Sequence, residues 1–167
     1  RFKESPEYVM GDTAQRAWAG ICVSRGGVVC PVYDYTEISP EDKAPAVMTM
    51  SGATIAPDVL YMSPATGMKW HDVKAKTEPT FRRLPPGPRW EHGCDYSAAC
   101  EYRHVQEQSG VAVFIIVHES SGAWLSIRLD RAFAIGDHRA DWPGGKAQPW
   151  RRGRRGRRTT HRQAIRQ

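Results

Sequence analysis

The sequence has no hydrophobic stretch long enough to cross a membrane as a helix. Its longest apolar run, residues 111–117, has the length of a buried strand, whereas a membrane-spanning helix needs about 18 or more such residues. No apolar segment follows the charged first residues, so we also expect no signal peptide there. We therefore expect a cytoplasmic protein with no membrane partner.

Cysteine is scarce, and its spacing matches none of the common metal-binding patterns. The chain has no C-x-x-C pair and no zinc-type spacing between cysteine and histidine; its four cysteines are Cys22, Cys30, Cys94 and Cys100. A domain of this length buries a core without needing disulfide bonds. We expect four reduced core cysteines, with two disulfides as the alternative.

Several catalytic signatures are also missing. No order of Ser, His and Asp, or of Cys and His, stands out along the chain. The glycine pairs at 26–27 and 144–145 match no phosphate-binding loop, and the body of the chain holds no internal repeat. The distribution of charge is therefore the first informative feature.

The net charge of +6 comes from one end of the 167-residue chain. Residues 151–167 carry no acid and eight arginines: Arg151, Arg152, Arg154, Arg155, Arg157, Arg158, Arg162 and Arg166. Residues 1–150 hold 16 basic and 18 acidic side chains, a net charge of −2. A cationic tail of this kind neutralises phosphates without reading sequence, or it is a disordered end with no function of its own.

Hydrophobic periodicity predicts alternating helices and strands in the body. Helical spacing covers 7–25 and 95–108, the second with Cys94 or Asp95 near its N-cap, and Gly110 follows its end. Extended segments are predicted at 28–35, 53–62, 68–77, 111–118 and 123–129, with loops at 36–52 and 78–93. We therefore expect an α/β or mixed α+β domain, one sheet flanked by helices, over residues 1–134. Residues 135–167 form a Gly-, Pro- and Arg-rich tail.

The chemically informative residues lie on the hairpin around the turn 63–67. If Ala65 is at the centre of this turn, Asp58 lies directly opposite Asp72, with β-carbons about 5 Å apart. Because side chains alternate along a strand, Asp72 and Lys74 share one face and His71 points to the other.

Two carboxylates this close repel each other unless a cation lies between them. Acids that hold Mg²⁺, together with a lysine that positions the nucleophile, are what metal-assisted phosphodiester hydrolysis requires. From the hairpin alone, a solvated sheet face with mixed charges explains the pattern equally well.

The order of motifs resembles the PD-(D/E)xK nuclease superfamily, which has the restriction-endonuclease-like fold. Pro57-Asp58 and Asp72-x-Lys74 are its core, and three flanking stretches over residues 7–130 support the resemblance: 11–15 (GDTAQ), 90–95 (WEHGCD) and 102–113 (YRHVQEQSGVAV). The similarity is greater to small phage and bacterial nucleases of the Holliday-junction-resolvase type. It implies a restriction-endonuclease-like central mixed sheet flanked by helices.

The resemblance also implies an activity and a site. The protein would be a Mg²⁺- or Mn²⁺-dependent deoxyribonuclease of a bacterial or phage-infected cell, acting on duplex, branched or single-stranded DNA and leaving a 5′-phosphate. Asp58, Asp72 and the Val73 carbonyl would bind the metal, and Lys74 would be the catalytic lysine. Many relatives act as homodimers, so a homodimer is one option.

The main departure from the superfamily is Gln15, which stands where the first helix normally carries an acid. Either the site works with one metal ion, or Asp12 or Glu7 replaces the missing acid, or activity is weakened. A catalytically inactive DNA-binding or assembly protein with the nuclease fold therefore remains the alternative.

Further residues are candidates for DNA contact. Lys76 shares a strand face with Asp72 and Lys74, and Gln106 lies on the second helix, where glutamines of some superfamily members face the site. The remaining candidates are Arg82, Arg83, Arg89, Arg151, Arg152, Arg154 and Arg155. A solvated surface explains each loop arginine equally well. We interpret His118 and Glu119, at the end of the apolar strand, as structural.

Overall fold

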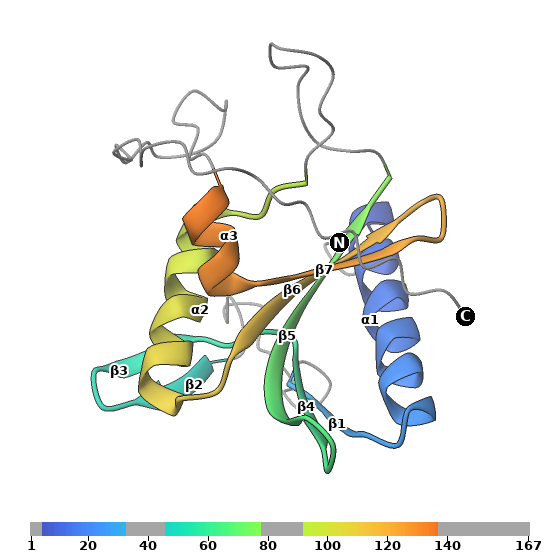
Figure 1. Ribbon diagram of the computed structural model, residues 1–167. Coiled ribbons are helices and arrows are strands. Elements are labelled where there is room, and N and C mark those ends of the chain that lie inside the picture. The colour runs from blue at the N-terminus through green and yellow to red at the C-terminus, as the bar shows by residue number, and fades with distance from the viewer. Residues whose placement is uncertain (1–4, 33–45, 78–91, 137–167) are drawn as a thin grey trace.

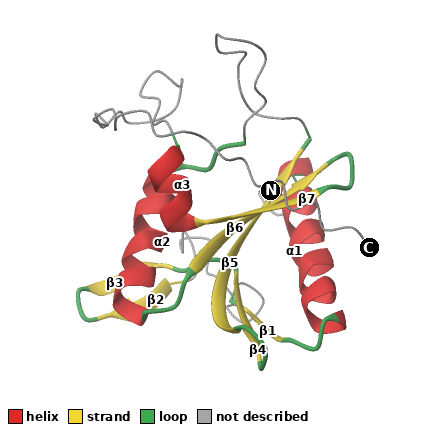
Figure 2. Ribbon diagram, in the orientation of Figure 1, coloured by secondary structure: helices red, strands yellow, loops and turns green. Residues whose placement is uncertain are grey.

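The fold is a five-stranded mixed sheet in the order β1-β4-β5-β6-β7, seen in a computed structural model that describes residues 5–32, 46–77 and 92–136. The strands are β1 (Val28–Pro31), β4 (Val59–Ser63), β5 (Gly67–Lys76), β6 (Val113–Glu119) and β7 (Trp124–Arg128). Only β5 and β6 pair in parallel, and the other neighbours are antiparallel. β5 is the central strand and the longest (Figure 2).

Helices cover both faces of this sheet. α1 (Pro6–Ser24) packs on one face, whereas α2 (Tyr96–Ser109) and α3 (Leu129–Ile135) lie on the other (Figure 1). The parallel β5–β6 pair needs a crossover connection, and the segment containing α2 supplies it. The expected α/β domain with one sheet flanked by helices is confirmed.

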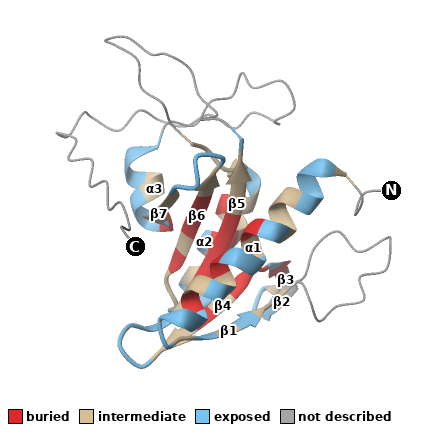
Figure 3. Cartoon of the chain, turned by 90° about the vertical axis from the view of Figure 1, so that its right-hand side faces the viewer, coloured by how far each residue is buried: buried red, intermediate tan, exposed pale blue. Residues whose placement is uncertain are grey.

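The sheet separates two hydrophobic cores, because alternate side chains of each strand point to opposite faces. The α1 side buries Trp18, Tyr61 and Val73, and the α2 side buries Trp70 and Ile115. Burial is greatest along β5 and β6 (Figure 3). A side chain on β5 is therefore in one core or the other according to whether its number is odd or even.

Local capping signals mark the boundaries of the two long helices, close to where the sequence predicts them. The Ser5 hydroxyl accepts a hydrogen bond from the Tyr8 N–H at the start of α1, and the Asp95 carboxylate accepts from the Ser97 and Ala98 N–H groups at the start of α2. Gly110 ends α2 with φ 68°, a left-handed conformation that favours glycine.

Two short segments differ from the prediction. The expected loop 36–52 contains β2 (Ala46–Thr49), and the expected strand 53–62 divides into β3 (Gly52–Ile55) and β4. β2 and β3 form a separate hairpin against α2, held by hydrogen bonds from Thr54 to Glu101 and between Ser51 and His104. The division at 56–58 has a physical reason: Pro57 lacks an N–H for a sheet ladder, so the strand stops there.

The prediction also missed α3, because its seven residues are too few for a clear helical period. The cysteine prediction holds in part: all four cysteines are free, but only Cys22 is buried and Cys30 is exposed. In the described part of the chain, no helix combines the length and apolarity needed to cross a membrane. The tail 137–167 lies outside the described residues.

His71 lies in the core beneath α1, on the opposite face from Asp72, as the strand alternation predicts. The Trp18 Nε1–H donates a hydrogen bond of 2.9 Å to its Nδ1, and the Tyr61 ring stacks on it at 5.4 Å. Burial, with a smaller effect of Lys69, lowers the pKa of His71 to about 4. This histidine is therefore a neutral core residue that joins α1 to β5.

Replacing Trp18 by Phe tests this link. The change keeps most of the ring but leaves the buried Nδ1 of His71 without its donor, so we expect unfolding to become easier by about 1–3 kcal/mol. Urea denaturation measures the effect, with Met48→Ala, at a residue 79% exposed, as a control expected to change stability little. Equal stabilities for the Trp18 variant and the control would contradict this role.

Candidate active site

The two acids of the hairpin lie together at the centre of the molecule. Val59 pairs with His71 in the β4–β5 ladder, which is the register expected from the turn, so Asp58 is the next residue opposite Asp72. Asp72 is 0% exposed and Asp58 is 4% exposed. Two carboxylates on adjacent strands are thus enclosed almost completely.

Asp58 is held at both its backbone and its side chain. Its carbonyl accepts a hydrogen bond from the Val32 N–H (2.9 Å), and its Oδ2 accepts from the Val73 N–H (2.7 Å). The side chain therefore reaches across to the backbone of β5, beside Asp72. Chain segments before β4 and within β5 together set the spacing of the two acids.

The environment of Asp58 disfavours its charged form. Its pKa is raised to about 7, chiefly by burial and next by the Asp72 carboxylate. The Lys74 ammonium, the Val73 N–H and a hydrogen bond from the Gln15 side chain act in the opposite direction but do not cancel the rise. The protein alone therefore does not fully balance the paired negative charge.

Lys74 is placed next to the pair, as expected from its position on the same face as Asp72. Its Nζ lies 2.8 Å from Asp72 Oδ1, and its side chain is 30% exposed while that of Asp72 is 0% exposed. Lys74 thus extends from the buried acids toward solvent. From this position, Lys74 can contact both the buried acids and a molecule that approaches the sheet.

The acids fit a hard divalent cation. Asp72 Oδ2 is buried and accepts no hydrogen bond from the part of the chain that is described, so one carboxylate oxygen is left for a ligand. Carboxylate oxygens are the donors that Mg²⁺ prefers, and Mg²⁺ binds through one or two carboxylates while keeping several waters. Among residues 5–32, 46–77 and 92–136, no group of three or more His, Cys, Asp or Glu is placed to hold a metal. The side chains available as metal ligands are therefore the Asp58 and Asp72 carboxylates, together with one amide.

That amide belongs to Gln15, which α1 brings to Asp58. α1 packs against β5, and the Gln15 side chain is close enough to the Asp58 carboxylate to lower its pKa. Asp12 does not replace the missing acid, because its carboxylate pairs with Arg16 at 2.9 Å on the helix surface. Glu7 lies in the first turn of α1 and is exposed. The first-helix position of the site is therefore neutral.

Sequence reasoning missed two neighbours of Lys74 that precede α2. Burial raises the pKa of the Cys94 thiol, the Asp72 carboxylate raises it further, and Lys74 lowers it. The pKa of Asp95 is lowered chiefly by a hydrogen bond from the Ser97 side chain, with a smaller effect of Lys74. The sequence pattern of segment 90–95 predicted that these residues begin a helix, but not that they interact with Lys74.

The remaining candidates have different outcomes. Lys76 ends β5 on the same face as Asp72 and Lys74. Gln106 Oε1 accepts a hydrogen bond from the Val113 N–H at 2.9 Å, so Gln106 joins the C-terminal part of α2 to the start of β6, and its contact with DNA stays a prediction. His118 stacks on Trp124 at 4.2 Å between ring centroids, as a structural residue. The candidates outside the described residues are Arg82, Arg83, Arg89, Arg151, Arg152, Arg154 and Arg155.

No known family model matches the chain, and no curated protein matches it. Among solved structures, the chain is similar to Hjc, a Holliday junction resolvase from the archaeal hyperthermophile Archaeoglobus fulgidus. The two chains are 14% identical, the match covers 72% of this chain and 78% of that one, and the TM-score is 0.48. At this level, the similarity assigns neither a family nor an activity to this chain.

The raised pKa of Asp58 predicts how the stability of the metal-free protein depends on pH. The folded state binds this proton more tightly than the unfolded chain, whose pKa stays near 3.8. Stability is therefore lost as pH rises from about 4 to about 7, by on the order of a few kcal/mol. Thermal melts over this range, with chelator present, measure the loss.

Asp72→Asn provides the comparison, because it removes the neighbouring charge and keeps the shape. The loss of stability over this pH range should be smaller in this variant than in the wild type, and adding Mg²⁺ should reduce it in the wild type. The same pH dependence in both proteins would contradict the interaction between the two carboxylates.

Proposed function

We propose that this protein is a metal-dependent deoxyribonuclease that hydrolyses DNA phosphodiester bonds. The observation that carries the proposal is the buried Asp58–Asp72 pair with Lys74 beside it. Burying two carboxylates together is unfavourable, and the pKa of about 7 for Asp58 reflects that cost. A site that keeps both acids, with one buried oxygen unsatisfied in the described part of the chain, is well suited to a divalent cation.

In this proposal, Asp58 and Asp72 hold Mg²⁺ or Mn²⁺, with the Val73 carbonyl as a third ligand. The ion supplies Lewis-acid polarisation of the phosphate and lowers the pKa of a bound water. Lys74, anchored by Asp72 and partly exposed, contacts the phosphate or the attacking water as a fixed positive charge. Val73 donates its N–H to Asp58, which holds this carboxylate in place and partly offsets the rise of its pKa.

DNA is the proposed substrate because positive charge continues from the site. Lys76 follows Lys74 on the same face of β5, one pleat further along. The loop arginines Arg82, Arg83 and Arg89 and the arginine-rich tail are proposed to add phosphate contacts that do not depend on base sequence. Homodimer formation and a cytoplasmic location belong to the same proposal.

Cleavage of supercoiled plasmid, a four-way junction and single-stranded DNA tests the activity. We expect cleavage of at least one substrate with Mg²⁺ or Mn²⁺ and none with chelator. Asp72→Ala and Lys74→Ala should each lower the rate by at least about 10³-fold, because each removes charge that stabilises the transition state. The ends of the product should carry a 5′-phosphate.

Arg131→Ala is the matched control, because Arg131 is an exposed cation on α3 and not on α1, β4 or β5, which carry the site. It should cleave at close to the wild-type rate. Circular dichroism checks that each variant is folded. Cleavage that survives both Asp72→Ala and Lys74→Ala would rule out this site.

A second function, DNA binding without cleavage, is favoured by one observation. The first-helix position beside Asp58 is occupied by neutral Gln15, so the site has less negative charge for a metal than the superfamily pattern implies. In that case the protein binds DNA, or an assembly on DNA, through the same face and the cationic tail. Removing residues 150–167 should then abolish most of the affinity, and salt should weaken binding steeply.

Gln15→Glu separates the two functions. A third carboxylate beside Asp58 should lower the melting temperature without metal and tighten Mn²⁺ binding by roughly tenfold, measured by calorimetry. A wild type that does not cleave and a Gln15→Glu variant that does would identify an inactive nuclease site. Unchanged melting temperature and Mn²⁺ affinity would show that Gln15 does not face the acids.

A further inference from the structure

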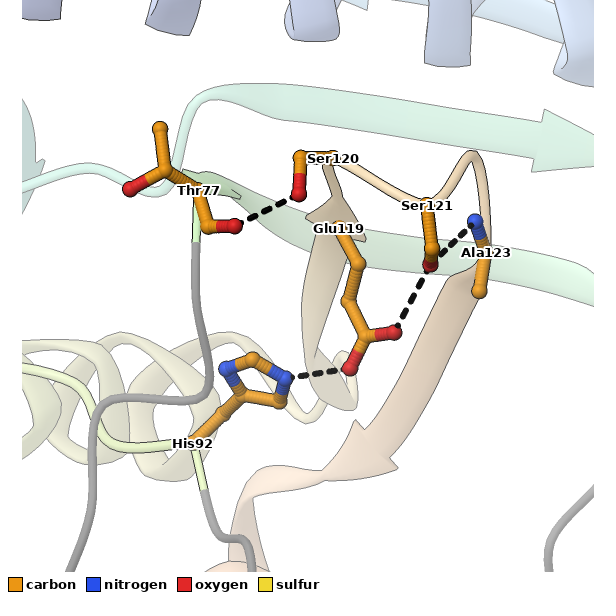
Figure 4. Close-up of polar contacts among 6 residues, drawn as sticks. All are labelled: Thr77, His92, Glu119, Ser120, Ser121 and Ala123. Atoms are coloured by element: carbon orange, nitrogen blue, oxygen red, sulfur yellow. Dashed lines mark hydrogen bonds and ion pairs between the residues drawn. The ribbon is translucent and has the colours of Figure 1, made fainter.

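The turn between β6 and β7 contacts both segments that hold the candidate site. On one side, the Ser120 N–H donates to the Lys76 carbonyl (3.1 Å) and the Ser120 Oγ donates to the Thr77 carbonyl (2.5 Å), at the end of β5. On the other side, Glu119 Oε1 lies 2.6 Å from His92 Nε2, in the segment before α2 (Figure 4). One turn therefore joins the end of the strand that carries Lys74 to the segment that carries Cys94 and Asp95.

The Glu119–His92 contact is partly buried and well supported. The side chain of His92 is 12% exposed and that of Glu119 is 26% exposed. The Ser121 Oγ donates to Glu119 Oε2 (3.1 Å; Figure 4), and the Glu119 N–H donates to the Ala123 carbonyl (2.9 Å). Because the carboxylate is held on both oxygens, it is a fixed support for the histidine and not a flexible surface partner.

His92 is two residues before Cys94 and three before Asp95, and Lys74 lowers the pKa of both of these residues. The charges of Asp72 and Lys74 both affect the pKa of Cys94, and the charge of Lys74 affects the pKa of Asp95. Asp95 also begins α2, where it accepts the Ser97 N–H at 2.7 Å. His92 is therefore covalently close to residues that interact electrostatically with Lys74.

We propose that Glu119 and His92 are positioning residues, which hold the segment 92–95 against β5 and thereby set the surroundings of Lys74. This inference rests on the proposed nuclease function for its effect on catalysis, but the positioning itself is independent of that function. The role of the two residues is to keep the start of α2 at a fixed distance from the lysine.

Alkylation of Cys94 by iodoacetamide, followed by peptide mass spectrometry, tests the positioning without any DNA or metal. In Glu119→Ala the segment should open more often, and the labelling rate of Cys94 should rise roughly tenfold. Cys22, buried on the inner face of α1, is the internal reference and should label at an unchanged rate. Glu119→Gln, which keeps an acceptor oxygen for His92, should restore most of the protection.

Glu107→Ala is the matched control, because Glu107 is an exposed acid on α2 whose carboxylate lies 3.8 Å from Arg103. His92→Ala removes the same contact from the other side and replaces Glu119→Ala if that variant does not fold. A Cys94 rate no higher than in the control would overturn the proposal. So would a parallel rise at Cys22, which would mean that the pair stabilises only the whole fold.

The effect on catalysis is measured separately. In Glu119→Ala, the kcat for DNA cleavage should fall several-fold, whereas Mn²⁺ affinity should stay within about twofold of wild type because both acids remain. Unchanged kcat in an active protein would overturn the link to Lys74. If the wild type cleaves no DNA, the proposed function fails, and the Cys94 rates alone decide whether the pair positions the segment.

Discussion

The repulsion between Asp58 and Asp72 is the constraint on which the rest of the site depends. Two carboxylates enclosed by a protein are stable only where donors or cations surround them. This fold supplies the Val73 N–H, the Gln15 amide and the Lys74 ammonium, and the pKa of Asp58 still rises to about 7. α1, β5 and the segment before α2 all contribute to the same charge balance. The core of the molecule is therefore built around a polar site and not around apolar packing alone.

The two faces of the sheet differ in chemical character. The face beneath α1 is largely aromatic, with neutral His71 held by Trp18 and Tyr61. The face beneath α2 carries Asp72 and Lys74 in a setting that includes Cys94 and Asp95. Gln15 and Asp58 lie where these two regions meet, at the residue before β4 begins. A substitution in either core can therefore alter the site, although only one face presents the lysine.

Short-range rules predicted the parts of the fold that depend on them. The turn 63–67 and the period of two placed Asp58 opposite Asp72, and the Asp95 and Gly110 signals placed the ends of α2. Gln15 was found from its place in a motif. The pairing of His92 with Glu119 was not predictable, because 27 residues separate them and no local pattern links them. The strands β3 and β4 and the helix α3 are too short for hydrophobic periodicity to locate their boundaries.

The alternation along β5 also limits how the sequence of this strand can change in length. Trp70, His71, Asp72, Val73 and Lys74 point in turn to the two cores, and each is suited to its own side. Inserting or deleting a single residue before Asp72 would exchange all later side chains between the faces, moving the lysine under α1 and the neutral core residues toward the proposed metal site. Changes of two residues would preserve the faces and cost only a displacement along the ladder. In a library of insertions and deletions, this strand should therefore tolerate even changes in length more readily than odd ones.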